Sequence, residues 1–125
     1  MKLLLDTHVL LWWLDNPKQI SPKARDAISD ENNLVFVSAA VVWEIVIKKA
    51  LDKLEAPDNL SEVVAENRFE PLAITIEHAL AVEKLPSYHR DPFDRMQIAQ
   101  AMVEGMTIVT RDTDIAKYVV PQLRA

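Results

Sequence analysis

The sequence predicts a small α/β fold in which helices flank a central parallel sheet. Short apolar segments alternate with longer segments of helical character, which is the order of elements in parallel α/β proteins. Strand candidates such as Leu3–Leu5 and Leu34–Val37 are apolar at every position, as expected for strands that are buried on both faces. The chain has 125 residues, half of them hydrophobic, and we expect residues 1–125 to form a single domain.

Capping residues and prolines mark the ends of the expected helices. Ser21-Pro22 and Asp91-Pro92 each place a capping residue before a proline at the first helical position, and Gly105 is placed to end the second of these helices. The expected elements, in order, are a strand at 3–5, a helix from 6 or 7 to 14, a helix from 21 to about 30, a strand at 34–37, a helix at about 40–54, a short helix at 61–67, a weaker strand at 71–74, a helix at about 76–85, a helix from 91 to 105, a strand at 107–110 and a last short helix beginning at 112.

Composition excludes several classes of function. The chain has no cysteine, which excludes disulfide scaffolds, thiolate zinc sites and cysteine nucleophiles. Its single glycine, Gly105, excludes the glycine-rich phosphate loops of dinucleotide-binding and P-loop proteins. The formal net charge of −5 argues against a broad basic surface for nucleic acid, but it leaves a metal-dependent site open.

No targeting segment or membrane span is expected. No apolar run approaches the ~18 residues that cross a bilayer. Asp6 interrupts the N-terminal apolar run too early for a signal peptide. We therefore expect a soluble, cytoplasmic protein that makes no membrane contact.

Two acids directly follow predicted strands. Asp6 comes immediately after the strand at 3–5, and Asp112 comes two positions after the strand at 107–110. Ligands of parallel sheets bind beyond the carboxyl ends of the strands, so both acids are placed for a binding site. Each also has a simpler explanation as the N-cap of the next helix.

A third acid, Glu44, lies in a segment that is otherwise apolar. The residues around it, 41–47, include no other charged side chain, which predicts a largely buried helix. A buried carboxylate requires a partner or a metal ion. An ion pair with one of the arginines of the chain is the alternative explanation.

Asp94 and Asp114 each fall in the first turn of an expected helix, where an acid also compensates the helix dipole. Asp91, three residues before Asp94, is placed to cap its helix. Several carboxylates gathered at one edge of a sheet would raise one another's pKa unless a cation offset their charge. Mg²⁺ and Mn²⁺ prefer such oxygen ligands, and carboxylate-bound metals of this kind serve phosphoryl chemistry.

Four blocks of the sequence resemble the PIN-domain ribonucleases and, within that family, the VapC-type toxins of bacterial type II toxin–antitoxin pairs. The blocks occur in the family's order and span essentially the whole chain: LLLDTHVLLW at 3–12, VSAA at 37–40 with WEI at 43–45, HRDPFDR at 89–95 and VTRD at 109–112. The resemblance implies a PIN-like three-layer sandwich and a ribonuclease that depends on Mg²⁺ or Mn²⁺. It also implies cleavage of single-stranded or structured RNA to 5′-phosphate and 3′-hydroxyl ends, homodimerisation, and neutralisation by a VapB-type antitoxin.

By position, the resemblance assigns four catalytic acids that also bind the metal. They are Asp6, Glu44, Asp94 and Asp112. Asp114 could share the last role, because the family's spacing after the final strand varies.

Threonines and arginines beside these acids are further candidates. Thr7 and Thr110 resemble residues that orient metal ligands. Arg95 and Arg111 flank two of the acids and could contact the RNA backbone. Salt bridges to neighbouring acids are an equally good explanation of the two arginines.

The histidines and tryptophans carry weaker signals. His8 is expected to pack against the helix that follows it, and His78 and His89 show no ligand spacing. Helical spacing sends Trp12 and Trp13 to different sides of their helix. One indole can meet the sheet, and the other can meet an antitoxin segment, a dimer partner or a second layer of the same domain.

Other functions remain open from the sequence. The chain could be a PIN nuclease of RNA processing rather than a toxin, or a metal-free α/β interaction module whose acids are caps and ion pairs. A receiver-type signalling domain fits less well because no lysine follows the last strand, and an Asp-x-Asp phosphatase is excluded because position 8 is His8. Divalent-metal titration of Asp6→Asn and Asp94→Asn variants separates the nuclease from the module.

Overall fold

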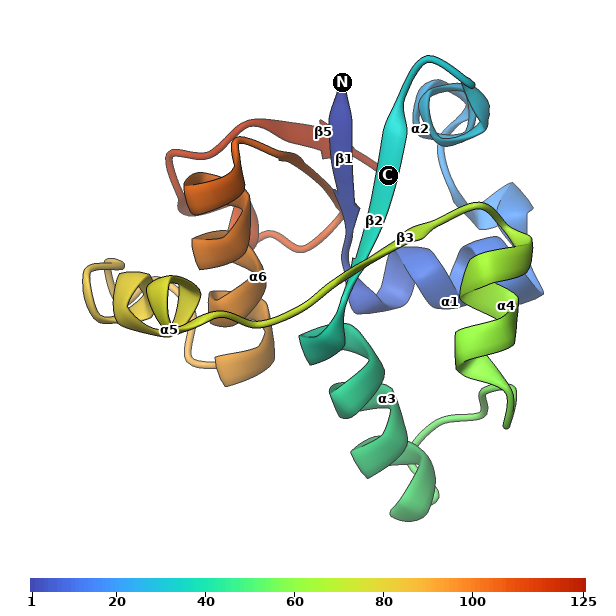
Figure 1. Cartoon of the computed structure of the whole chain (residues 1–125), viewed down its shortest axis with the longest axis horizontal. Helices are drawn as coiled ribbons and strands as arrows, with labels where there is room; N and C mark the ends of the chain where they lie inside the picture. Colours follow the sequence, from blue (N-terminus) through green and yellow to red (C-terminus); the bar gives the residue numbers. More distant parts are fainter.

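A five-stranded parallel sheet forms the centre of the protein (Figure 1). The computed structural model describes residues 1–125 throughout. The strands are β1 (Lys2–Leu5), β2 (Leu34–Ser38), β3 (Glu70–Leu72), β4 (Thr107–Thr110) and β5 (Gln122–Arg124). They lie in the order β3-β2-β1-β4-β5, and each neighbouring pair is parallel. The first strand of the chain is therefore the middle strand of the sheet.

Helices lie on both sides of this sheet, which confirms the predicted three-layer α/β fold. The α-helices are α1 (Thr7–Asp15), α2 (Pro22–Ser29), α3 (Ala39–Ala50), α4 (Leu60–Glu66), α5 (Ile76–Glu83) and α6 (Pro92–Glu104), with short 3-10 turns η1 (Pro17–Gln19) and η2 (Ile115–Lys117). Figure 1 shows α5 and α6 on one side of the sheet and α1, α2 and α4 on the other, with α3 leading away from the end of β2. None of the helices is both long and apolar enough to cross a membrane.

The middle strand is buried on both faces. Leu3 and Leu5 belong to the larger of two hydrophobic clusters, whereas Leu4 between them belongs to the smaller one. Successive side chains of a strand point to opposite faces, so one apolar run contributes to both clusters. This arrangement explains why the buried positions of the strand, Leu3–Leu5, are all apolar, while Lys2 at its start is exposed.

The predicted caps begin and end the helices as expected. Ser21 Oγ accepts the Ala24 N–H at 3.2 Å, and Asp91 Oδ1 accepts the Phe93 N–H at 2.8 Å. Gly105 ends α6 in the left-handed conformation with φ of 66°, which glycine adopts without steric cost. These local signals therefore identify where α2 and α6 begin and where α6 ends.

The end of α3 was predicted wrongly. The helix ends at Ala50 rather than at residue 54. Asp52 adopts a positive φ of 55°, and the N–H groups of Asp52 and Lys53 bond to the carbonyls of Lys49 and Lys48. This is the hydrogen-bond pattern of a left-handed C-terminal cap, formed here without glycine, so the sequence carried no obvious stop signal.

The C-terminal elements also differ from the prediction. No helix begins at Asp112, because residues 115–117 form only the single 3-10 turn η2. Strand β5 was not predicted, since Gln122–Arg124 has only three residues and just one of them is apolar. Pairing with β4 holds these residues in the sheet, and that pairing is not visible in their own sequence.

The two tryptophans of α1 diverge, as their spacing predicts. Trp13 packs against Phe69 and donates from Nε1 to Asn67 Oδ1 at 3.1 Å. Trp12 lies beneath the guanidinium of Arg111, which is 4.5 Å from the ring centroid. Both indoles are half-buried and have partners within the chain, so α1 is covered on two sides by the domain itself.

Candidate active site

Four acids from four different elements lie at the carboxyl edge of the sheet. Asp6 follows β1, Asp112 follows β4, Glu44 lies in α3 and Asp94 lies in the first turn of α6. The carboxylates of Glu44 and Asp112 both raise the pKa of Asp94, and Asp112 raises that of Asp6. The fold therefore brings these four charges near one another, although up to 106 positions separate them in the chain.

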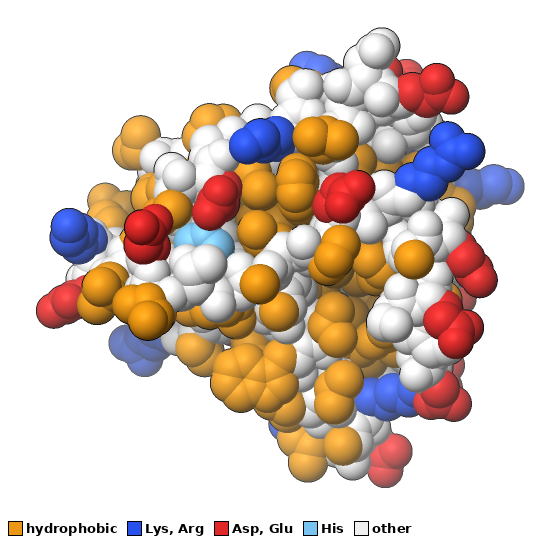
Figure 2. Space-filling view, viewed as in Figure 1, with side chains coloured by type: hydrophobic (Ala, Val, Ile, Leu, Met, Phe, Trp, Pro, Cys, Tyr) orange, Lys and Arg blue, Asp and Glu red, His pale blue; other side chains and the backbone are white.

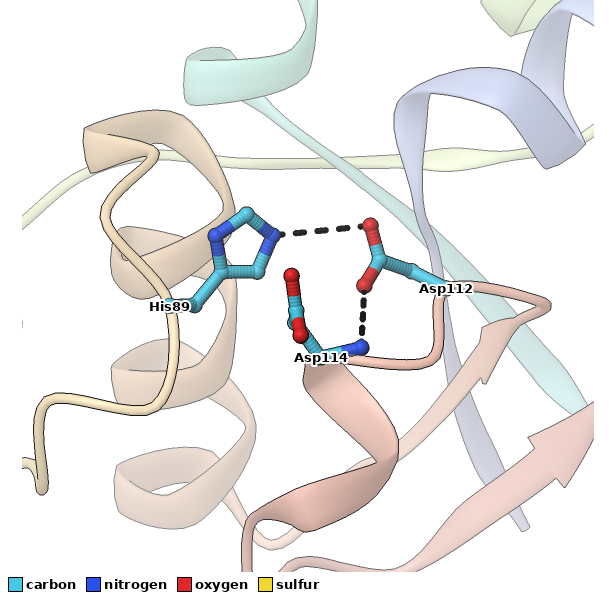
Figure 3. A group of neighbouring side chains, drawn as sticks. All are labelled: His89, Asp112 and Asp114. Atoms are coloured by element: carbon cyan, nitrogen blue, oxygen red, sulfur yellow. Dashed lines mark hydrogen bonds and ion pairs between the residues drawn. The ribbon is translucent and has the colours of Figure 1, made fainter.

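The four acids are not packed as a tight ligand set. No three of these four acids each place an oxygen atom within 4.8 Å of the other two. The group that meets this distance consists of His89, Asp112 and Asp114 (Figure 3). A cation shared by all four acids would therefore require side chains to move.

Asp6 is held by both of its carboxylate oxygens. Oδ1 accepts the Val9 N–H at 2.8 Å and so caps α1, and Oδ2 accepts the hydroxyl of Thr110. Burial raises the pKa of Asp6, although the hydrogen bonds from Thr110 and Val9 act in the opposite direction. Asp6 is thus a helix cap whose second oxygen is oriented by the neighbouring strand.

Glu44 is only 2% exposed, as the apolar segment predicted. Its Oε1 accepts the Thr7 hydroxyl at 2.5 Å, and its Oε2 lies 2.5 Å from Lys48 Nζ. The ion-pair partner is therefore a lysine one helical turn away rather than an arginine. Lys48 was missed in the sequence, although its i+4 spacing from Glu44 was a signal that could have found it.

Asp94 has a strongly perturbed carboxyl group. Burial and the nearby Asp91 raise its pKa to about 7, with smaller contributions from Glu44 and Asp112, while His89 lowers it. A carboxyl group with this pKa is partly protonated at neutral pH. It would ionise fully if a positive charge entered the site.

Asp112 behaves differently from Asp94. Burial disfavours its charge, but hydrogen bonds from the Ile115 and Asp114 N–H groups and the nearby His89 outweigh burial and lower its pKa. Asp112 Oδ1 accepts those two N–H groups at 3.0 and 2.7 Å, and thereby fixes the backbone that leads into η2. Asp114 is instead 3.1 Å from Lys117 and more exposed.

His89 joins the site, which its sequence spacing did not indicate. Its Nε2 lies 2.8 Å from Asp94 Oδ2 and 3.4 Å from Asp112 Oδ2, the second of which Figure 3 shows. Its Nδ1 accepts the Asp91 N–H at 3.1 Å. Because Nδ1 accepts, Nε2 carries the proton of the neutral ring, and it lies within ion-pair distance of both carboxylates without a hydrogen bond of standard geometry to either.

The other two histidines lie outside this group. His78 is fully buried, completes a capping box with Thr75, and lies 2.9 Å from Glu104. His8 is exposed and packs at 6.0 Å, between ring centroids, against Trp12. His8 thus contacts its own helix, as predicted.

The two candidate arginines bond to backbone carbonyls and not to the acids. Arg95 donates to the carbonyls of Pro86, His89 and Val82 and to the hydroxyl of Tyr118. Arg111 donates to the carbonyls of Ala125 and Gln19. Neither forms the salt bridge that the sequence left open. Arg95 holds the loop that carries His89, and Arg111 holds the C-terminal residue.

The donor set fits a hard divalent cation. All four acids offer carboxylate oxygens, which Mg²⁺ and Mn²⁺ prefer, and no thiolate is present. Lys48 is the only lysine or arginine that pairs with any of Asp6, Glu44, Asp94 and Asp112. The site therefore carries an excess of negative charge that a dication would offset.

Comparisons with known proteins agree with this fold. The family model of the PIN domain matches residues 3–120. Ribonuclease VapC22 of Mycobacterium tuberculosis is 32% identical over 124 residues, which cover 92% of this chain and 90% of that protein.

Solved structures show the same architecture. A crystal structure of VapBC2 from Rickettsia felis, bound to a DNA fragment from its promoter, aligns with a TM-score of 0.74 and 14% identity over 100% of this chain and 99% of the other. DNA-bound VapBC from Salmonella typhimurium aligns with a TM-score of 0.74 and 18% identity over 99% and 98%. At these identities the likeness concerns the fold.

Proposed function

The chain belongs to the PIN-domain family, and from this membership we propose that it is a divalent-metal-dependent endoribonuclease that acts as the toxin of a VapBC-type pair. The observation that carries the proposal is the gathering of Asp6, Glu44, Asp94 and Asp112 at one edge of the sheet with a single lysine among them. The substrate class is single-stranded or structured RNA, and residues 1–125 act as one PIN domain.

Mg²⁺ or Mn²⁺ is the proposed cofactor. Asp6, Glu44, Asp94 and Asp112 would hold it, and Asp114 is an additional candidate ligand. When bound, the cation would supply the positive charge that ionises a water molecule and screens the scissile phosphate. The support for this assignment is the carboxylate-only character of the four acids.

The chain's own residues prepare the acids for this role. Thr7 and Thr110 donate to Glu44 and Asp6, which orients one oxygen of each carboxylate. The Asp94 carboxyl group holds a proton part of the time near pH 7 and releases it when positive charge approaches.

RNA contacts by Arg95 and Arg111 are a secondary part of the proposal. Their guanidinium groups are anchored on backbone carbonyls beside Asp94 and Asp112. Substitution of either arginine by lysine would test whether this edge of the sheet contacts the RNA backbone, with RNA affinity as the measurement.

RNA cleavage by the purified protein tests the nuclease function. We expect cleavage in the presence of Mn²⁺ or Mg²⁺, its loss with EDTA, and its loss in both Asp6→Asn and Glu44→Gln, with 5′-phosphate and 3′-hydroxyl ends at the cuts. Circular dichroism serves as the control for folding of the variants. Cleavage that survives both substitutions would refute the assignment.

An apolar groove between α3 and α4 is the proposed antitoxin site. It encloses about 710 Å³, and nine of its eleven lining residues are hydrophobic, among them Val42, Val64 and Phe69. Figure 2 shows hydrophobic side chains gathered over α3 and toward α4 on this face of the molecule. A concave apolar groove suits a helical or extended peptide segment, as an antitoxin would supply. Ala65→Glu should abolish neutralisation by the co-expressed partner while RNA cleavage persists.

Exposed apolar side chains of α3 and α5 are the proposed homodimer contact. Trp43 and Val46 of α3 and Ile76 and Leu80 of α5 are all more than half exposed. Large apolar side chains at this exposure are typical of an interface, and a protruding helix suits contact with a second copy. Light scattering should give a dimer for the wild type and a monomer for Leu80→Asp. A monomeric wild type would refute this contact.

One observation favours a metal-free interaction module as the second candidate. Three of the four acids already have a role within the chain: Asp6 caps α1, Asp112 accepts the N–H groups of Asp114 and Ile115, and Glu44 pairs with Lys48. Calorimetric titration with Mn²⁺ distinguishes the two functions. Binding that disappears in Asp6→Asn or Asp94→Asn supports the nuclease, and no binding by the wild type supports the module. A PIN nuclease of RNA processing would cleave RNA but would require no antitoxin.

A further inference from the structure

Lys48 is a charged residue of the site to which the proposed reaction gives no role. Its Nζ lies 2.5 Å from Glu44 Oε2, and Thr7 Oγ1 lies 2.5 Å from Oε1. Both oxygens of Glu44 therefore accept a hydrogen bond from the chain itself. One of the two donors carries a full positive charge, so Lys48 neutralises a carboxylate that is proposed to bind metal.

The ammonium group also interacts with other acids of the site. The hydrogen bond to Glu44 raises the pKa of Lys48, and the carboxylates of Asp91 and Asp94 raise it further. Arg95 donates its hydrogen bonds to backbone carbonyls and to a tyrosine hydroxyl. Lys48 is therefore the cation that faces this group of carboxylates.

A dication and Lys48 compete for Oε2 of Glu44, because two positive charges at such short range repel strongly. Glu44 is 2% exposed and is held by Thr7, whereas the Lys48 side chain is 35% exposed. Lysine also has a flexible four-carbon stem. Lys48 is thus the group that can move when a cation binds.

We propose that Lys48 is an exchangeable counter-ion of Glu44, which a divalent cation displaces and which then binds a phosphate of the RNA substrate. The second step follows from charge, because the displaced ammonium is positive and partly exposed and the substrate brings an anion to the site. Lysine binds phosphate readily as a point charge. This inference rests on the proposed nuclease function and adds a substrate contact to it.

The competition can be measured as a double-mutant cycle of Mn²⁺ affinity by calorimetry. Lys48→Met should bind Mn²⁺ roughly two- to fivefold more tightly than the wild type, since a competing partner of Glu44 is removed. Lys49→Met is the matched control, because Lys49 is the next residue and pairs with the exposed Asp58. In a Glu44→Gln background the gain from Lys48→Met should vanish. A gain of equal size in that background would reveal only a general charge effect and would overturn the exchange.

Lysine-selective NMR tests the exchange directly, even if Glu44→Gln binds no metal. Saturating Mg²⁺ should move the ammonium signal of Lys48 and leave that of Lys49 in place. A Lys48 signal unchanged at saturation would overturn the exchange.

Steady-state kinetics test the phosphate contact. Lys48→Met should raise the KM for RNA about three- to tenfold and change kcat less, while Lys49→Met changes neither. An unchanged KM in Lys48→Met would overturn the contact. Failure of the wild type to cleave RNA would instead refute the nuclease function, and the Mn²⁺ cycle and the Mg²⁺ spectra would still decide whether Lys48 competes for Glu44.

Discussion

Replacing Asp94 by asparagine should stabilise the protein at alkaline pH when EDTA removes metal. The folded protein raises the pKa of Asp94 from 3.8 to about 7, chiefly by burial. At a pH between these two pKa values, Asp94 is protonated in the folded state and ionised in the unfolded state. The contribution of Asp94 to the free energy of unfolding therefore falls as pH rises from about 4 to about 7. Above that range its full destabilising effect is present.

The magnitude follows from the pKa change. A rise from 3.8 to about 7 corresponds to roughly 4 kcal/mol at about 1.4 kcal/mol for each factor of ten in the ionisation constant. Asp94→Asn removes this cost but loses a favourable helix-dipole interaction of about 0.3–1 kcal/mol. It also loses the charged partner of His89, 2.8 Å away. We therefore expect a net gain of about 2 kcal/mol at pH 8, on the order of 6–10 °C in Tm.

Urea unfolding in EDTA at several pH values between 4.5 and 8 measures this effect. The stability difference between Asp94→Asn and the wild type should grow with pH across that range. Asp26→Asn is the control, since Asp26 is an exposed acid of α2. Added Mg²⁺ should reduce the difference at pH 8 by stabilising the wild type. A difference that stays constant with pH would show that Asp94 does not titrate in this range and would refute the argument.

Three further outcomes follow from the packing and hydrogen bonds. Leu4→Ala should lower the free energy of unfolding in urea by about 2–5 kcal/mol because Leu4 is fully buried. Leu34→Ala, at a position that is 52% exposed, should lower it by less than about 0.5 kcal/mol, and equal losses would contradict the two-sided core. Gln97→Met should raise the free energy of unfolding by about 1 kcal/mol, since both amide atoms of this buried side chain lack partners, and a loss would show that the amide is satisfied. Thr110→Val should weaken Mn²⁺ binding about tenfold in calorimetry by freeing an oxygen of Asp6, and unchanged affinity would argue against Asp6 as a ligand.

Local chemistry explains the elements that were predictable. The apolar run Leu3–Leu5 indicated a strand buried on both faces, and the caps Ser21 and Asp91 indicated two helix starts. Each signal depends on residues within one or two turns of each other. The end of α3 depends instead on Asp52 adopting a positive φ, and β5 depends on a neighbouring strand.

In the candidate site, too, some features follow from local sequence and others from contacts between remote segments. The residue pattern is enough to identify the candidate acids, because Glu44 lies in an apolar helix and Asp6 and Asp112 follow strands. Their remote partners depend on the tertiary structure: His89 lies against Asp94, and Thr7, 37 positions from Glu44, donates to its carboxylate. Spacing along a chain sets contacts within a helix or turn, but contacts between remote segments depend on how the helices pack on the sheet.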